Sequence, residues 1–278
     1  MALQQYALQT DAGELSYRAA GTGNVVVLLH GFGEDSRIWY QQAAFLEQLG
    51  YRVLLPDFPG SGSSTLSEHT IITIEWLAAV VNSLLEHEKV SSCILLGHSM
   101  GGYVTLAFAE KWPEKLLGFG LIHSTAFADS EDKKEARRKS MAFIREKGTR
   151  PFLQATLPNL FGLRFQDQQP DAINTLLQWA ATISASALTG YYAAMLQRPD
   201  RTAVLQKAEV PVLFFIGAED KAVSPEDALL QSSFPSVALV KKVEGIAHMG
   251  MWEAADELHE LLLQYLQVVF PSTNQPTA

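Results

Sequence analysis

Cysteine is almost absent from the sequence, and this limits the covalent and metal chemistry open to the chain. Cys93 is the only cysteine among 278 residues, so no disulfide can form within the chain. It lies in an apolar run typical of a buried strand, where a thiol is a small core side chain. None of the seven histidines has the close spacing to cysteine or carboxylate that is typical of a zinc site. We therefore expect a reducing, cytoplasmic setting, with no metal and no cofactor.

Positive charge is also scarce. The chain has 21 basic and 30 acidic residues, which gives a net charge of -9 at pH 7. This charge repels nucleic-acid phosphates and anionic lipid headgroups. The N-terminus lacks the basic start and long apolar centre of a signal peptide. The longest uncharged stretch, 172–197, is interrupted by Asn, Gln, Ser and Thr, unlike a membrane span. We expect a small-molecule partner, no nucleic acid and no membrane span.

Apolar residues, in contrast, make up 47% of the chain, enough for a large core. Several apolar runs are typical of strands buried on both faces of a largely parallel sheet, among them 25–29, 51–55, 116–122 and 210–216. Two shorter pieces, at 4–9 and 14–18, predict an N-terminal hairpin, and 237–243 predicts a last strand. Segments with helical periodicity lie between these strands. The alternation predicts an α/β fold.

One motif lies at the centre of the sequence. The apolar run from Cys93 leads into Gly97-His98-Ser99-Met100-Gly101 and then into a helical segment. A sharp strand-to-helix turn holds a serine hydroxyl above the sheet edge, and glycines on either side prevent crowding. The helix N-terminus also favours a developing negative charge there. Ser99 is therefore the candidate nucleophile; the alternative is a glycine-rich turn with an idle serine.

A second glycine loop, His30-Gly31-Phe32-Gly33, follows the strand 25–29. Loops at the carboxyl ends of parallel strands face ligands, and glycines let backbone amides approach them. We expect the amides of Phe32 and Met100 to form an oxyanion hole, the alternative being a simple turn into the next helix. In the following Gly/Pro/Ser-rich loop, Asp57 is expected to accept backbone N–H bonds and to have a structural role.

The acid and the base come later in the chain. Asp220 lies three residues after Gly217, at the end of the strand 210–216, and is expected to orient a histidine; Glu219 is the alternative. His248 follows the last strand, where a base could reach Ser99. His123, at another strand end, is the second choice.

Residues 126–207 change in composition and contain no strand-like run. The charged segment 130–139 predicts a solvated helix, and further helices are expected at 151–160, 172–184 and 187–198. We expect this block to cover the carboxyl edge of the sheet as a lid. The last two helices carry no charge from 172 to 197. We expect one face to pack on the main domain and another to line an apolar substrate cavity, the alternative being lid core or a dimer contact.

The apolar side chains around these motifs suggest a substrate pocket. Those expected to bind substrate, together with the Phe32 and Met100 side chains, are Trp39, Tyr191, Met249 and Trp252. Such a pocket favours a small ester with an aliphatic or aromatic acyl group.

In their order, these motifs resemble the α/β-hydrolase superfamily, specifically its lidded single-domain serine hydrolases, which include esterases. The resemblance covers nearly the whole chain and is carried by 30–33, 57–63, 97–102, 217–223 and 245–248. It implies a mostly parallel eight-stranded sheet flanked by helices, with a helical lid after strand six. The core would be 1–125 and 208–270, the lid 126–207, and 271–278 a disordered tail.

The resemblance also assigns a triad, in the order serine, acid, histidine, to Ser99, Asp220 and His248. Some relatives carry the acid after the sixth strand, but 123–125 contains none here, which supports Asp220. The implied reaction is hydrolysis of a small carboxylic ester through an acyl-enzyme. The same triad could serve a thioesterase, an amidase, a perhydrolase or a carbon-carbon bond hydrolase, and some relatives are small-molecule receptors with little turnover.

Overall fold

A computed structural model of the chain describes residues 3–10 and 13–271. Its centre is an eight-stranded sheet in the order β1-β2-β4-β3-β5-β6-β7-β8. β1 pairs with β2 and β2 with β4 in antiparallel fashion, and the remaining neighbours are parallel. The predicted mostly parallel eight-stranded sheet is confirmed. The strands are β1 Gln4–Thr10, β2 Gly13–Ala20, β3 Val25–Leu29, β4 Arg52–Pro56, β5 Cys93–His98, β6 Leu116–Ile122, β7 Val212–Gly217 and β8 Ala238–Val243.

The burial of each strand follows its position in the sheet. Every residue of β3, β5 and β7 is buried, because helices cover both faces of the sheet centre. β8 lies at one edge and mixes exposed and half-buried residues, and β1 at the other edge is mostly exposed. The continuous apolar runs in the sequence are therefore the central strands.

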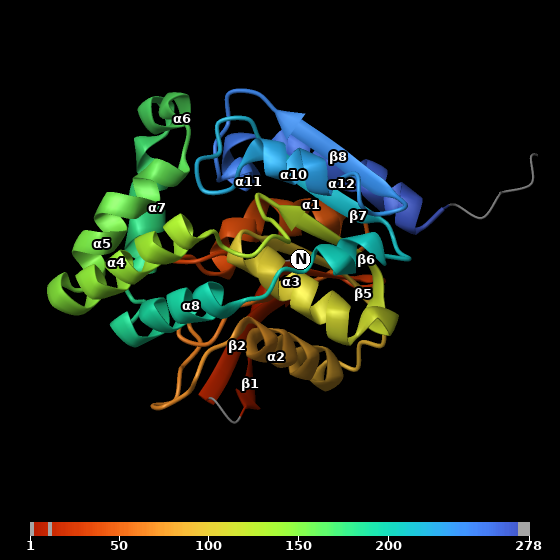
Figure 1. The fold of residues 1–278 in the computed structure, drawn as a ribbon. Helices are drawn as coiled ribbons and strands as arrows, with labels where there is room; N and C mark the ends of the chain where they lie inside the picture. Colours follow the sequence, from red (N-terminus) through yellow and green to blue (C-terminus); the bar gives the residue numbers. More distant parts are fainter. Residues whose placement is uncertain (1–2, 11–12, 272–278) are drawn as a thin grey trace, which may run out of the picture.

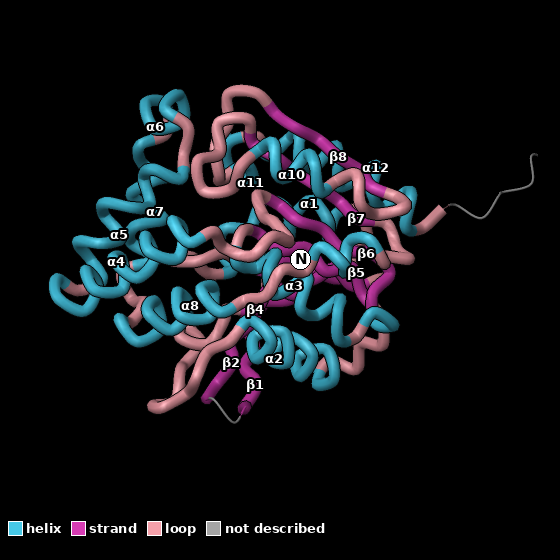
Figure 2. Tube along the Cα trace, in the orientation of Figure 1, coloured by secondary structure: helices cyan, strands magenta, loops and turns pink. Residues whose placement is uncertain are grey.

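Helices lie on both sides of this sheet. Figure 1 shows α2 and α3 on one side and α12 on the other, and in Figure 2 the magenta strands run between them. The helices are α1 Tyr40–Gln48, α2 Ile74–His87, α3 Met100–Lys111, α4 Glu131–Lys147, α5 Thr149–Thr156, α6 Leu163–Gln168, α7 Pro170–Ala180, α8 Ala185–Gln197, α9 Thr202–Gln206, α10 Pro225–Gln231, α11 Gly250–Glu253 and α12 Ala255–Val269, with 3₁₀ turns η1 Ser36–Trp39, η2 Pro113–Lys115 and η3 Leu157–Leu160.

The helices α4 to α9 follow β6 and precede β7 in the chain, within residues 126–207. Figure 1 shows α4 to α8, coloured green to teal, gathered at one side of the molecule. The insertion is not isolated from the sheet, since Leu157, Leu188 and Tyr191 belong to the same buried apolar cluster as the central strands. We call residues 126–207 the helical insertion.

Two further expectations concern the chain as a whole. Across 3–10 and 13–271, no helix has both the length and the apolar character needed to cross a bilayer. The tail expected to be disordered, 271–278, falls outside the described residues except for Pro271.

Candidate active site

Ser99 lies at the turn between β5 and α3 with φ 50° and ψ −113°, a left-handed conformation that few non-glycine residues adopt. Hydrogen bonds hold this turn. The Ser99 N–H donates to the Ile122 carbonyl at 3.0 Å, and the Ser99 carbonyl accepts from the Ser124 hydroxyl at 2.7 Å. A side chain at Gly97 would collide with the Gly101 carbonyl. The glycines of the motif are thus required by close backbone packing.

The two amides predicted for the oxyanion hole are unoccupied by protein acceptors. Neither the Phe32 nor the Met100 N–H donates a hydrogen bond to a described residue. Met100 is the first residue of α3, where an intrahelical acceptor is lacking. The loop that carries Phe32 is fixed by Glu34, whose carboxylate accepts from the Gly31 N–H at 2.8 Å. Both amides are therefore available to an external oxygen.

The structure brings Asp220 and His248 together. The Asp220 Oδ2 atom lies 2.7 Å from Nδ1 of His248, and Oδ1 accepts from the backbone N–H groups of Ala222 at 2.8 Å and Val223 at 3.0 Å. Burial alone would raise the pKa of Asp220, but the charge of His248 and the histidine hydrogen bonds hold it well below its usual range. Glu219, the alternative acid, is exposed.

His248 is fixed from several directions. The backbone N–H of His248 donates to the Leu160 carbonyl at 2.8 Å, and its backbone carbonyl accepts from Nε2 of His98 at 2.9 Å. The neighbouring amides of Ala247 and Met249 donate to the Glu253 carboxylate. Burial opposes protonation of His248, but the Asp220 carboxylate outweighs it and raises the pKa of the imidazole above its usual value.

His123, the second choice for the base, contacts Asp220 from another side. Its Nδ1 lies 3.2 Å from the same Oδ2, and its Nε2 accepts from the Gly250 N–H at 3.1 Å. Since Nε2 is an acceptor, Nδ1 carries the proton and donates to Asp220. Burial, only partly offset by Asp220, lowers the pKa of His123 to about 4. His123 is therefore a neutral donor that has already used both ring nitrogens.

Three of these side chains could also be considered as metal ligands. His123, Asp220 and His248 place ligand atoms within 4.8 Å of one another. However, the His123 Nδ1 proton points at Asp220, and that carboxylate already accepts four hydrogen bonds. Because a histidine nitrogen must be free of its proton to bind a metal, this arrangement fits a hydrogen-bond network better than a metal site.

Ser99 and His248 line one cavity of about 260 Å³, together with Phe32. Its walls also include Leu157 and Leu160 of η3, Tyr192 and Met195 of α8, and Lys133 and Arg137 of α4. The charged segment 130–139 was expected to be solvated, but Lys133 and Arg137 share the face of α4 that turns inward with Ile144.

The four side chains predicted to bind substrate do not line this cavity, which corrects the sequence-based pocket. Trp39 is fully buried beside His98, and Met249 is fully buried. The Tyr191 hydroxyl bonds to the Pro59 carbonyl at 2.7 Å, and the Trp252 ring donates to the Ile38 carbonyl at 2.9 Å. All four pack against the loops around the site. Large apolar side chains beside such a loop support the loop as readily as they line a pocket, so their positions in the sequence did not distinguish the two roles.

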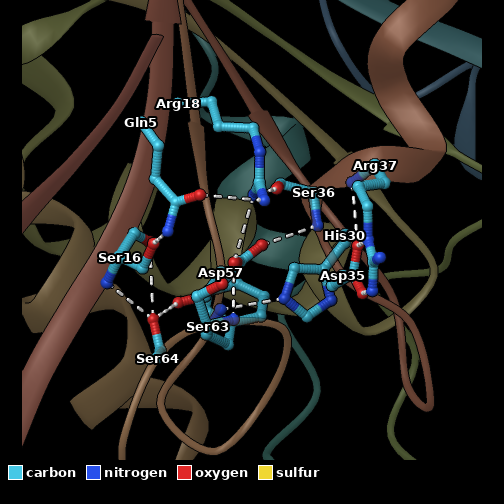
Figure 3. A network of polar contacts seen from close by, with 11 residues as sticks. Gln5, Ser16, Arg18, His30, Asp35, Ser36, Arg37, Asp57, Ser63 and Ser64 are labelled. Carbon is cyan, nitrogen blue, oxygen red and sulfur yellow. Dashed lines mark hydrogen bonds and ion pairs between the residues drawn. The ribbon is translucent and has the colours of Figure 1, made fainter. Parts of the chain in front are cut away.

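Asp57 has the structural role expected for it. Its carboxylate accepts from the amides of Ser36 at 2.9 Å and Ser63 at 3.0 Å and pairs with Arg18 at 3.3 Å, as Figure 3 shows. Nearby, Nε2 of His30 accepts from the Phe58 amide. This network fixes the loops after β3 and β4, and it does not include the Ser99 cavity.

Two acids near the site were not singled out from the sequence. Glu34 lies 2.9 Å from Nδ1 of His98, and its pKa is lowered because His98 outweighs the effect of burial. Glu253 accepts from the Gly162 amide at 2.8 Å, which joins the helical insertion to the His248 loop. The only signal was position: Glu34 is three residues past Gly31, and Glu253 is five past His248.

Comparisons with known proteins agree with this fold. The profile of the family described as alpha/beta hydrolase fold matches residues 24–255. The chain is similar to the magnesium-chelatase 30 kDa subunit of Rhodobacter capsulatus, with 26% identity over 264 residues, 88% of this chain and 87% of that protein. It is also similar to the 2-hydroxy-6-oxononadienedioate/2-hydroxy-6-oxononatrienedioate hydrolase of Escherichia coli (strain K12), with 25% identity over 270 residues, 91% and 90% of the two chains. Among solved structures, a malate-bound thermophilic esterase from Thermogutta terrifontis superposes with a TM-score of 0.89 and 27% identity, over 96% of this chain and 99% of that one.

Proposed function

The chain belongs to the α/β-hydrolase fold family and is a hydrolase, and on this premise we propose that it cleaves a small carboxylic ester through an acyl-enzyme on Ser99. One observation carries the proposal. A serine in a strained strand-to-helix turn lines the same cavity as a histidine whose other ring nitrogen contacts a buried carboxylate. A candidate nucleophile and a candidate base thus line one cavity, and the base contacts a candidate orienting acid, which supports acyl transfer as the reaction.

In the proposed mechanism, His248 Nε2 takes the proton of Ser99 as the hydroxyl oxygen attacks the ester carbonyl. Asp220 holds the proton on Nδ1 and stabilises the imidazolium that forms. The amides of Phe32 and Met100 donate hydrogen bonds to the carbonyl oxygen as it becomes negative, a contribution of about 3 kcal/mol per donor. His248 then protonates the leaving alcohol and activates water, which releases the acid.

Covalent labelling tests the nucleophile. An alkyl fluorophosphonate is expected to add one adduct to the protein at Ser99, located by mass spectrometry after digestion. Ser99→Ala should lose this adduct and reduce ester hydrolysis at least about 10⁴-fold. Ser67→Ala, a change of an exposed serine that does not line the cavity, serves as the control and should label normally. An adduct at another residue would overturn the assignment.

A panel of substrates then separates the proposed reaction from its alternatives. p-Nitrophenyl esters of increasing acyl length should show an optimum at short chains, since the cavity holds about 260 Å³. The similarity to an Escherichia coli 2-hydroxy-6-oxononadienedioate hydrolase makes compounds of that type the second set to test. If the esters give neither a burst of product nor turnover, and a bound ligand stabilises the protein against unfolding, the result would instead indicate a receptor.

A further inference from the structure

The cavity beside Ser99 is lined by an excess of positive charge. Among the residues that the structure describes, its lining includes Lys133, Arg137 and Lys221, besides His248, and a single carboxylate, that of Glu34. The chain as a whole, in contrast, has a net charge of -9. A cationic cavity in an acidic protein is a local departure from the net charge of the chain. It attracts anions to a place where the rest of the molecule repels them.

The single carboxylate does not balance these cations. Glu34 is only 1% exposed, and its Oε2 atom is already bonded to the Gly31 amide at 2.8 Å and to His98 at 2.9 Å. Its charge is therefore directed at the ring of His98 and at its own loop. None of the three cations has Glu34 as an ion-pair partner in the described part of the chain.

Arg137 shares its partner with a second arginine. Its Nε atom donates to Oδ2 of Asp129 at 2.6 Å, while Nη1 of Arg198 lies 2.8 Å from Oδ1 of the same carboxylate. One negative charge thus lies between two guanidinium groups, both of which are always protonated. The group of three carries a net charge of +1. Arg137 also lies over the ring of Tyr192, with 5.5 Å from its Cζ atom to the ring centroid, and both side chains line the cavity.

The two lysines have no acidic partner among the residues described. The ammonium group of Lys133 donates to the carbonyl of Ala222 at 3.0 Å, an uncharged acceptor, and Lys221 is exposed at the cavity mouth. Lys133 comes from α4 of the helical insertion, and Lys221 comes from the loop after β7 that carries Asp220. An anion between them would therefore contact the insertion and the core at once.

We propose that the substrate carries an acidic group, a carboxylate, that binds against Lys133, Arg137 and Lys221 while its ester carbonyl lies at Ser99. The inference rests on the proposed esterase function and narrows its substrate class to monoesters of dicarboxylic acids or esters of hydroxy acids. A carboxylate here offsets the repulsion between two lysines that have no acidic partner in the described part of the chain and an arginine that shares its one acid, Asp129, with Arg198. Its partly buried position makes the attraction stronger than at an open surface.

Paired substrates test the charge preference directly. Monomethyl adipate is compared with dimethyl adipate, and 4-acetoxybutanoate with its methyl ester, so that the acid lies on the acyl side in one pair and on the alcohol side in the other. In one pair or both, we expect kcat/KM to be at least about tenfold higher for the acidic ester at low ionic strength. This ratio should fall toward one in about 0.5 M salt, because salt screens the attraction.

Variants assign the preference to the cavity. Lys133→Gln and Lys221→Gln should each lower the ratio of acidic to neutral ester about two- to fivefold, and the double variant about tenfold. Lys139→Gln is the matched control: it removes the same charge from an exposed position on the same helix, and its ratio should equal that of the wild type. A ratio of one or less in both pairs, or a high ratio that the cavity variants leave unchanged, would overturn the proposal.

A binding measurement separates this inference from the esterase proposal. Normal labelling of Ser99 and hydrolysis of neutral esters without any acid preference would reject only the anion site. If neither labelling nor hydrolysis occurs, the esterase function fails, and calorimetry with adipate still decides the anion site: binding that Lys133→Gln weakens supports it, and absence of binding rejects it. Inhibition by inorganic phosphate but not by adipate would reject carboxylate as the ligand.

Discussion

At the scale of the residue, His123 and His248 contact the same oxygen of Asp220, and their pKa values are shifted in opposite directions. His248 titrates with a raised pKa, whereas burial keeps the pKa of His123 at about 4 and its ring neutral. Nε2 of His123 also accepts a hydrogen bond from the Gly250 amide at 3.1 Å. It has no free nitrogen for a proton transfer from Ser99, and it supports Asp220 as a fixed N–H donor.

Replacing His123 tests this supporting role. His123→Phe removes one of four hydrogen bonds to Asp220. The acid should then be more basic, and the midpoint of the acid limb of kcat/KM should move to higher pH, with kcat lowered about tenfold. His69→Phe is the control, since His69 shares the left-handed backbone but is exposed. A reduced rate with an unmoved midpoint would show that His123 is only a packing residue.

The pH profile of the wild type follows from the state of the base. His248 must be neutral to accept the Ser99 proton, and its pKa is raised above 6.5. Hydrolysis should therefore increase with pH through a midpoint above 6.5. In Asp220→Asn, burial acts without the opposing carboxylate, so the midpoint should fall while kcat falls about 10⁴-fold. A midpoint that stays or rises in this variant would contradict the assignment of Asp220.

Single residues also show where prediction from sequence ended. The turn at Ser99 could be predicted because its motif is local: five adjacent residues specify it. Lys133 could not be assigned to the cavity, because helical periodicity shows that a helix has two faces but not what each face meets. The prediction of an apolar substrate pocket around Trp39 was wrong for a related reason, since side chains buried against substrate and side chains buried against protein have the same sequence pattern.

At the scale of the element, Glu253 at the end of α11 joins two segments that are distant in sequence. Its carboxylate accepts from the amides of Gly162 at 2.8 Å and Met249 at 3.0 Å. The first belongs to the helical insertion and the second to the loop of the base. Burial raises the pKa of Glu253, while the three amides that it accepts from, Gly162, Ala247 and Met249, oppose that rise.

Glu253→Gln is expected to destabilise this junction. Glutamine retains one acceptor oxygen for three amide donors, so the free energy of unfolding should fall by about 2 kcal/mol, and kcat should fall with it. Urea unfolding and steady-state kinetics measure both. Glu244→Gln, which changes an acid 81% exposed in the same loop region, should alter stability by less than about 0.5 kcal/mol. Equal effects of the two substitutions would argue against a special role for Glu253.

Elements were predicted with unequal success. The central strands were identified because strands covered on both faces are continuous apolar runs, and β3, β5 and β7 are of this kind. The short helices α6 Leu163–Gln168 and α9 Thr202–Gln206 were missed. Segments of five or six residues span too few turns for their periodicity to be visible, and contacts with neighbouring elements determine whether they form.

At the scale of the whole molecule, the insertion and the sheet share one apolar core, so they should unfold together. Cys93 reports on the sheet, since it is fully buried and burial raises the pKa of its thiol to about 12. Its reaction with a disulfide reagent at pH 7.5 should require global unfolding. The urea midpoint for Cys93 labelling should match that for loss of helical circular dichroism. Loss of helix at lower urea than thiol exposure would show that the insertion unfolds separately.

The hydrogen bond from the His248 amide to the Leu160 carbonyl has a consequence for the order of events in turnover. In the proposed mechanism, this backbone contact joins η3, which lines the cavity, to His248, which would activate water. A displacement of η3 that admitted solvent would release the imidazole from its position in the same movement. An acyl-enzyme exposed in this way would meet water without the base that activates water, so deacylation would occur only while η3 is in place.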